Sequence, residues 1–155
     1  EASVDIAIDG ADQVADAGTL VKGGGGAHAR EKLVDSDADR FVVVADPSKL
    51  TTPLDYPVPL EVLPDARRPV ADAVRGAGGD PTLRAAERKD GPVVTDNGNL
   101  LLDCAFGAIT DPEALARTLS SEPGVVEHGL FVGLADEVHV GSDTGVEVRT
   151  VGSAD

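Results

Sequence analysis

The chain has 155 residues, of which 41% are hydrophobic and only 3% aromatic. This length suffices for one modest domain, or for a core with a small lobe, whose interior consists of aliphatic side chains rather than rings. Acidic residues outnumber basic ones by 28 to 13, which gives a formal net charge of −15. Such a surface repels nucleic-acid phosphates and anionic membranes, so neither is expected as a partner.

Cys104 is the only cysteine, so no internal disulfide forms and a cytoplasmic location fits. Its apolar surroundings, residues 100–106, predict a buried core residue rather than a nucleophile. No charged leader and no apolar run of about 18 residues occurs, which argues against a membrane segment. The chain contains no Met and begins at Glu1. We therefore expect further residues in front of it in the complete protein.

The first third of the chain alternates strand and helix signals. Residues 4–8 predict a short apolar strand, and residues 19–21 predict a second. Residues 27–37 predict a helix with Ala27, Leu33 and Val34 on one apolar face. The apolar run at residues 41–45 is typical of a strand covered on both sides.

Turn residues follow the last of these strands at Asp46 to Lys49, and polar residues gather at the strand ends. This alternation favours a parallel α/β sheet. Residues 138–140 and 146–148 are expected to return to it.

The middle of the chain has a different pattern. Three prolines lead into residues 60–63, which predict an edge strand, and a helix is expected over residues 68–77. Residues 92–95 and 100–102 flank an Asn-Gly turn and predict a hairpin. A helix that begins at Asp111 and a strand over residues 125–131 complete a β-α-β-β-α-β order.

That order predicts a small ferredoxin-like α+β lobe over residues 56–133. The remainder, residues 1–55 and 134–155, is predicted to form a Rossmann-like parallel sheet domain that is incomplete at its N-terminal side. The fold class is therefore α/β with an inserted lobe.

Two carboxylates, Asp9 and Asp12, stand three residues apart at the end of the first strand. In open α/β sheets, ligands bind at the carboxyl ends of the strands. A solvated turn that uses Asp for its turn preference is the alternative, and this motif alone does not decide between them.

Lys22 precedes four consecutive glycines, Gly23 to Gly26, and a helix follows them. Successive backbone N–H groups, the positive end of the helix and the lysine charge together favour an anion site. The motif is neither a P-loop nor a dinucleotide fingerprint, so a compact phosphate or an oxyanion suits it better than ATP or NAD.

Glu31 lies five residues beyond Gly26, in the first turns of the predicted helix, where it can face back towards the glycines. An ordinary surface glutamate near a helix N-terminus is the alternative. Lys49 follows the strand at residues 41–45 and is expected at the same sheet edge. One rim is thus predicted to collect Asp9, Asp12, Lys22, Glu31 and Lys49.

The histidines, His28, His128 and His139, lack metal-ligand spacing among themselves or with Cys104, so no metal site is expected. His28 is near the glycines, but an exposed helix position is expected for it. No G-x-S-x-G motif occurs, which argues against a serine hydrolase.

Seven blocks together resemble the A-type ribose-5-phosphate isomerase family in order and spacing. They are Asp9-Gly10-Ala11-Asp12, Lys22 with Gly23 to Gly26, Arg30-Glu31-Lys32, and residues 45–49, 57–62, 94–99 and 123–126. The resemblance implies interconversion of ribose 5-phosphate and ribulose 5-phosphate, in the non-oxidative pentose phosphate pathway, without metal or cofactor. It further implies a homodimer or homotetramer.

By the same resemblance, Glu31 is the base that moves a proton between C1 and C2, with Asp9 and Lys22 as further catalytic residues. The implied substrate-binding residues are Asp9, Gly10, Ala11, Asp12, Lys22, Gly23, Gly24, Gly25 and Lys49. Acid–base chemistry agrees, because an aldose–ketose isomerisation needs a carboxylate for the carbon-bound proton and donors for the enediolate oxygen. The residues leave open whether Asp9 or Asp12 assists ring opening.

The sequence departs from the family at one point: the Thr/Ser-rich phosphate loop near the family's N-terminus does not occur in this chain. We expect it in the residues that precede Glu1. The main alternative function is a non-catalytic sugar-phosphate sensor of the same fold, which does not need Glu31. A hexosamine-phosphate deaminase or an acyl-CoA transferase resembles the motifs less closely.

The charge pattern predicts adaptation to high salt, because Asp contributes nineteen residues and Lys only four. Salt screens the repulsion between carboxylates, so we expect the unfolding temperature to rise when molar KCl is added. Thermal unfolding followed by circular dichroism at low and at molar KCl measures this. An unfolding temperature that KCl leaves unchanged would contradict the prediction.

Overall fold

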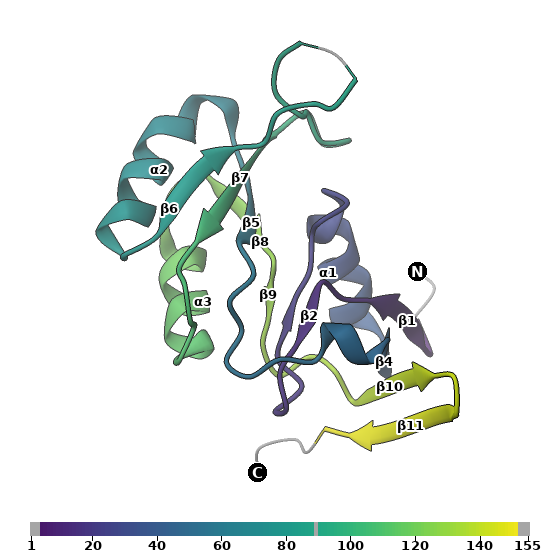
Figure 1. The fold of residues 1–155 in the computed structure, drawn as a ribbon. Helices are drawn as coiled ribbons and strands as arrows, with labels where there is room; N and C mark the ends of the chain where they lie inside the picture. The colour runs from purple at the N-terminus through teal and green to yellow at the C-terminus, as the bar shows by residue number, and fades with distance from the viewer. Residues whose placement is uncertain (1–3, 89, 152–155) are drawn as a thin grey trace.

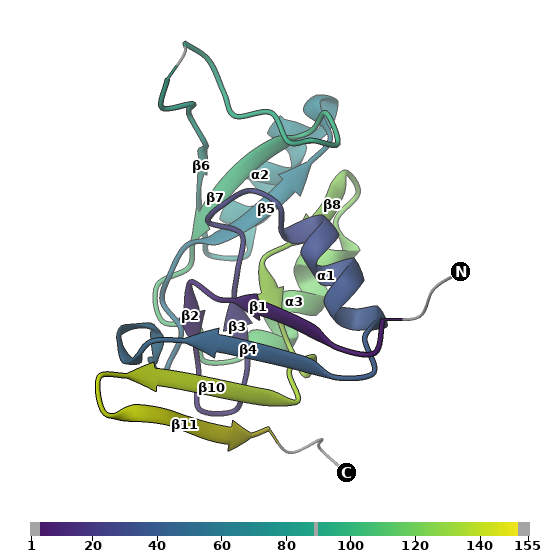
Figure 2. The same ribbon diagram turned by 90° about the vertical axis from the view of Figure 1, so that its right-hand side faces the viewer.

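The computed structural model describes residues 4–88 and 90–151. Its first sheet combines strands from the first and the last third of the chain. The strand order of this sheet is β1-β4-β10-β11, with bounds Ala7–Gly10, Phe41–Ala45, Glu137–Ser142 and Gly145–Thr150. Figure 2 shows the four strands side by side. β1, β4 and β10 are parallel, and β11 returns antiparallel along β10. The predicted return of residues 138–140 and 146–148 to the first sheet is therefore confirmed.

The two faces of this sheet differ. One face buries Ala7, Phe41, Val43, Val138 and Val140, together with other apolar side chains of the first core. The opposite face exposes a row of apolar side chains, Ile8, Val44, Val146 and Val148. The prediction of a strand covered on both sides is thus confirmed for most of β4 and wrong for Val44.

Helix α1, His28–Asp37, packs against β1 and against β8 of the second sheet. The predicted apolar face was wrong: Leu33 is 70% and Val34 50% exposed, whereas His28, Ala29 and Asp35 are buried. His28, expected to be exposed, is fully buried. Its Nε2 lies 3.2 Å from the carbonyl oxygen of Glu127, so the ring has a polar partner inside the protein. Apolar periodicity failed here because polar side chains with internal roles occupy the buried face.

The second sheet has the order β6-β7-β5-β8 and is antiparallel throughout. Its strands are β5 (Val58–Val62), β6 (Asp80–Leu83), β7 (Leu100–Ala105) and β8 (Val125–His128). Helices α2 (Arg67–Gly76) and α3 (Pro112–Ser121) cover one face of it, as Figure 1 shows. Asp111 caps α3 by accepting a hydrogen bond from the Ala114 N–H at 2.9 Å, as its acidic start predicted.

Two strand assignments in this unit needed correction. β5 lies between β7 and β8 and is buried along its length, so it is not an edge strand. Pro59 fits there because its carbonyl oxygen, not an N–H, makes the contact with the Gly129 N–H at 2.7 Å. β7 lies between β6 and β5, and residues 92–95 form no strand of this sheet. The predicted Asn-Gly hairpin is confirmed only as a tight turn, in which Val94 bridges Leu100 and the Thr95 N–H donates to the Asn99 carbonyl at 2.9 Å. β6 was missed because residues 80–83 are short and half exposed.

A third small sheet joins the two units, with strands β2 (Gln13–Val14), β3 (Leu20–Val21) and β9 (Leu130–Phe131). Because side chains alternate along a strand, Leu20 and Phe131 enter the first core. Val21 and Leu130 enter a second core, which also holds side chains of the second sheet and of α2 and α3. The two cores thus share the backbone of β3 and β9.

The predicted strand over residues 125–131 divides at Gly129, where the chain passes from the second sheet to the third. The Gly129 carbonyl accepts a hydrogen bond from the Lys22 N–H at 2.8 Å. A Cβ atom at this position would lie 2.1 Å from the Lys22 carbonyl oxygen, so only glycine permits this close approach. The overall architecture is a mixed α/β fold with one mixed sheet and two antiparallel sheets. No helix within residues 4–88 and 90–151 has the length and apolarity needed to cross a bilayer.

Candidate active site

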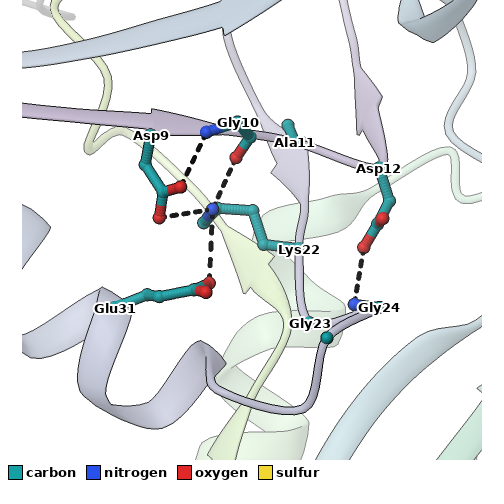
Figure 3. Close-up of a pocket in the computed structure, with 9 residues that line it drawn as sticks. Asp9, Gly10, Ala11, Asp12, Lys22, Gly23, Gly24 and Glu31 are labelled. Atoms are coloured by element: carbon teal, nitrogen blue, oxygen red, sulfur yellow. Dashed lines mark hydrogen bonds and ion pairs between the residues drawn. The ribbon is translucent and has the colours of Figure 1, made fainter.

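A cavity of about 260 Å³ opens where β1, β3, the glycine loop and α1 meet. Its lining consists of Asp9, Gly10, Ala11, Asp12, Lys22, Gly23, Gly24, Gly25 and Glu31, most of which are labelled in Figure 3. The structure therefore brings together every site residue predicted from the sequence except Lys49.

Lys22 lies at the centre of this group and is only 3% exposed. Its Nζ atom is 2.8 Å from Asp9 Oδ2, 2.5 Å from the Gly10 carbonyl oxygen and 3.3 Å from Glu31 Oε2. An ammonium group carries three N–H donors, and three protein oxygens surround it. These contacts offset the cost of removing the charge from water.

Asp9 and Glu31 approach the ammonium from two different elements, β1 and the first turn of α1 (Figure 3). Their side chains remain 34% and 30% exposed, so both carboxylates also face the cavity. Asp9 additionally accepts a hydrogen bond from the Gly10 N–H at 2.7 Å, which fixes its orientation. A carboxylate that is both held in place and accessible is suited to proton transfer.

The glycine loop follows Lys22 and is partly tied to the protein. The Gly24 N–H donates to Asp12 Oδ2 at 2.8 Å, and the Gly26 N–H donates to the Gly23 carbonyl at 2.9 Å. Of the four glycine N–H groups considered for an anion, those of Gly23 and Gly25 have no protein acceptor in the described part of the chain. Gly23 adopts φ +107, a conformation that other residues rarely reach.

Lys49 ends a short 3₁₀ helix, Pro47–Lys49, beyond β4. It lines a neighbouring depression that shares Gly10 and Ala11 with the central cavity. The structure therefore places Lys49 close to the predicted rim but outside the group around Lys22.

Asp35 is a residue that the sequence argument missed. It lies one turn beyond Glu31 on α1, is buried, and its Oδ2 atom has no hydrogen-bond partner among the described residues. Burial, followed by repulsion from Asp9, raises the pKa of Asp35 to about 6, although Lys22 opposes the shift. Its i, i+4 spacing from Glu31 was the available signal, since such residues share a helix face.

A second polar cluster surrounds His128, on the other side of α1. Lys32 Nζ lies 2.6 Å from Glu127 Oε1, and burial lowers the pKa of Lys32 although Glu127 opposes the shift. His128 Nδ1 accepts a hydrogen bond from the Leu130 N–H at 3.2 Å, so the ring proton belongs on Nε2 and points to Ser120 Oγ at 2.9 Å. In this tautomer His128 cannot take the Ser120 proton, so the pair is not an activated nucleophile.

Burial, together with the nearby charge of Lys32, lowers the pKa of His128 to about 4, so the ring is neutral near pH 7. Within residues 4–88 and 90–151, no group of three or more His, Cys, Asp or Glu side chains is arranged to hold a metal ion.

The fold and the cavity define a mixed α/β protein in which a buried lysine and two accessible carboxylates meet at the strand ends. Comparison with known proteins identifies the family: ribose 5-phosphate isomerase A (phosphoriboisomerase A) matches residues 1–145. The chain therefore belongs to the ribose 5-phosphate isomerase A family.

Two curated relatives are highly similar to this chain. The chain is 72% identical over 151 residues to ribose-5-phosphate isomerase A of Halorubrum lacusprofundi. The matched region covers 94% of this chain and 63% of that protein. It is 69% identical over 151 residues to the Haloarcula marismortui protein, covering 97% of this chain and 66% of that one. The chain thus spans slightly less than two thirds of the length of these relatives.

Solved structures agree with the fold. Ribose 5-phosphate isomerase A of Methanocaldococcus jannaschii superimposes with a TM-score of 0.91 at 45% identity, over 96% of this chain and 67% of that one. A D-ribose-5-phosphate isomerase in complex with phospho-erythronic acid gives a TM-score of 0.91 at 39% identity, over 96% of this chain and 66% of the other.

The buried carboxyl of Asp35 predicts a pH-dependent stability difference. A pKa raised from 3.8 to about 6 in the folded protein means that the wild type loses stability as the pH rises from about 4 to 7, because a charged carboxylate becomes buried. Asp35→Asn removes that penalty. At pH 7.5 we expect the variant to be about 1–2 kcal/mol more stable than wild type, a value discounted for solvent in the adjoining cavity.

The advantage of Asp35→Asn should shrink towards pH 4, where the wild-type carboxyl is protonated. Urea unfolding between pH 4 and 8 measures it, with Asp37→Asn as a matched control because Asp37 ends the same helix and is exposed. Parallel pH profiles for Asp35→Asn and wild type would show that Asp35 is not a buried, shifted acid.

Proposed function

We propose that this protein interconverts D-ribose 5-phosphate and D-ribulose 5-phosphate, as a catalyst of the non-oxidative pentose phosphate pathway. The observation that carries the proposal is the position of Glu31: its carboxylate faces the cavity, 3.3 Å from the buried Lys22 ammonium. Membership of the family and the relative in complex with phospho-erythronic acid support the same substrate class.

In the proposed reaction, Glu31 removes the proton from C2 of the open-chain aldose. The electrons of the broken C–H bond form the C1–C2 double bond, and the carbonyl electrons move to O1 to give an enediolate. Glu31 then returns the proton to C1, and the C2 hydroxyl proton is transferred to O1, which yields the ketose with a C2 carbonyl and a C1 hydroxyl. The proton balance closes within the substrate and the carboxylate groups, with Asp9 or Asp12 moving the hydroxyl protons.

Lys22 is proposed to stabilise the enediolate oxygen. Of its three contacts, that with Glu31 is the longest, at 3.3 Å against 2.8 Å and 2.5 Å. A substrate oxygen that replaces this contact would gain the ammonium charge and at the same time release Glu31 to act as base. Asp9 and the Gly10 carbonyl would keep Lys22 in place during the exchange.

The proposed substrate-binding residues are those that line the cavity, with Lys49 directed at a more distant part of the substrate. Lys49 fits that role because its depression adjoins the cavity through Gly10 and Ala11. No metal or cofactor is needed for the proton transfers described.

We further propose that residues 1–55 and 134–155 form a Rossmann-like catalytic domain and that residues 56–133 form a ferredoxin-like lobe. The strand order β6-β7-β5-β8 with α2 and α3 on one face supports the second assignment. We also propose a homodimer or homotetramer in the cytoplasm, where the free thiol of Cys104 stays reduced.

Glu31→Gln tests the proposal directly. The amide keeps the shape but cannot accept a carbon-bound proton, so kcat for ribose 5-phosphate should fall at least ~10³-fold. Ketose formation measured in molar KCl gives kcat, and circular dichroism checks the fold. Glu113→Gln is the matched control, because Glu113 is an exposed glutamate in the first turn of α3. Near-normal kcat in Glu31→Gln would remove Glu31 as the base.

A sugar-phosphate sensor remains the other outcome of this experiment. A sensor would bind ribose 5-phosphate without turnover in the wild type. Glu31→Gln would then still bind the sugar phosphate and would still show no turnover. The orientation of Glu31 into the cavity favours catalysis, because binding alone does not need a carboxylate next to an anionic substrate.

A further inference from the structure

Arg84 connects the second sheet to the glycine loop of the cavity. It directly follows β6, and its Nη1 atom lies 3.0 Å from the Gly23 carbonyl oxygen and 3.0 Å from the Gly24 carbonyl oxygen. The other side of the guanidinium is held by Asp103 of β7, with Nε 2.9 Å from Oδ2 and Nη2 2.5 Å from Oδ1. One rigid, planar group therefore binds two successive loop carbonyls.

These two bonds determine where the loop N–H groups point. In a planar trans peptide, the C=O and the N–H point in opposite directions. With the Gly23 carbonyl turned to Arg84, the Gly24 N–H points away from it, and there it meets Asp12 Oδ2 at 2.8 Å. With the Gly24 carbonyl also turned to Arg84, the Gly25 N–H must likewise point away from the guanidinium.

The Gly25 N–H is thereby available to a ligand. Gly25 lines the cavity, and no hydrogen bond to a protein acceptor is made by its N–H within the described residues. The flanking groups are tied by the Gly24 N–H to Asp12 and by the Gly26 N–H to the Gly23 carbonyl, whereas Arg84 alone holds the Gly24–Gly25 peptide within the described residues. A glycine run otherwise rotates easily. An external clamp is needed to keep such a peptide in one orientation.

We propose that Arg84 is a positioning residue that fixes the Gly23–Gly24 and Gly24–Gly25 peptides together, so that the Gly25 N–H is presented to an anionic oxygen of the substrate. This role rests on the proposed isomerase function and deepens it, because it assigns to the second sheet a part in the chemistry. Arg84 does not itself bind the substrate in this account, since Asp103 and the two loop carbonyls engage its Nε and both terminal nitrogens. The hydrogen bond from the Gly25 N–H should be strongest when negative charge develops on the enediolate oxygen.

Kinetics of Arg84→Met provides the first test. Loss of one oriented donor to a developing oxyanion should lower kcat about tenfold to hundredfold, with KM changed less than about threefold. Arg84→Lys keeps the charge but lacks the planar fork, so it should recover only part of kcat. Arg75→Met is the control, because Arg75 forms an exposed ion pair with Asp72 in the same unit and touches no loop carbonyl. A kcat within twofold of wild type in Arg84→Met would overturn the proposal.

Amide hydrogen exchange provides a second readout that does not require turnover. In Arg84→Met the Gly24 N–H should lose its alignment with Asp12 and exchange at least about tenfold faster by NMR, whereas Arg75→Met should leave it unchanged. Unchanged Gly24 exchange in Arg84→Met would overturn the proposal. Should Arg84→Met not fold, Arg84→Lys carries both measurements.

The two proposals fail in different ways. Absence of turnover in the wild type would reject the isomerase function, and Gly24 exchange would still decide whether Arg84 orients the loop. Normal turnover in the wild type, lost in Glu31→Gln but kept in Arg84→Met, would reject only the role of Arg84.

Discussion

The buried ammonium of Lys22 is the constraint on which the rest of the site depends. A cation that is 3% exposed needs compensating charge, and Asp9, Glu31 and the Gly10 carbonyl supply it from β1 and α1. The ring of Phe131 adds a cation–π contact, with its centroid 5.6 Å from Lys22 Nζ. The same electrostatic requirement that stabilises the core therefore brings two carboxylates to one cavity.

Both structural units contribute to this arrangement. The side chains of β3 and β9 divide between the two cores. The backbone of Lys22 is held next to Gly129, whose carbonyl accepts the Lys22 N–H at 2.8 Å. From the second unit, Arg84 reaches the carbonyls of Gly23 and Gly24. The second sheet, β6-β7-β5-β8, therefore supports the site through Arg84 as well as forming a separate layer of the fold. A proton transfer between fixed groups requires such a rigid support.

Much of the site followed from the sequence because its signals are local. The glycine run, the Asp9–Asp12 turn at a strand end and the position of Glu31 each depend on a few neighbouring residues. What failed depends on tertiary contacts: the buried face of α1 holds His28 and Asp35, which an apolar pattern assigns to solvent. β5 was placed at an edge because its prolines argue for one, whereas Pro59 makes its contact through the carbonyl. The i, i+4 spacing placed Asp35 on the helix face of Glu31, but only the folded structure shows that this face is buried at Asp35.

The most direct test of the account is the conversion of ribose 5-phosphate by the wild type in D₂O, followed by NMR. The Glu31 carboxylate is 30% exposed, so a proton held there should exchange in part with solvent before it returns to carbon. The account predicts formation of ribulose 5-phosphate with deuterium at C1. No conversion would contradict the isomerase activity, and conversion in which C1 never acquires deuterium would contradict proton transfer through a solvent-accessible carboxylate such as Glu31.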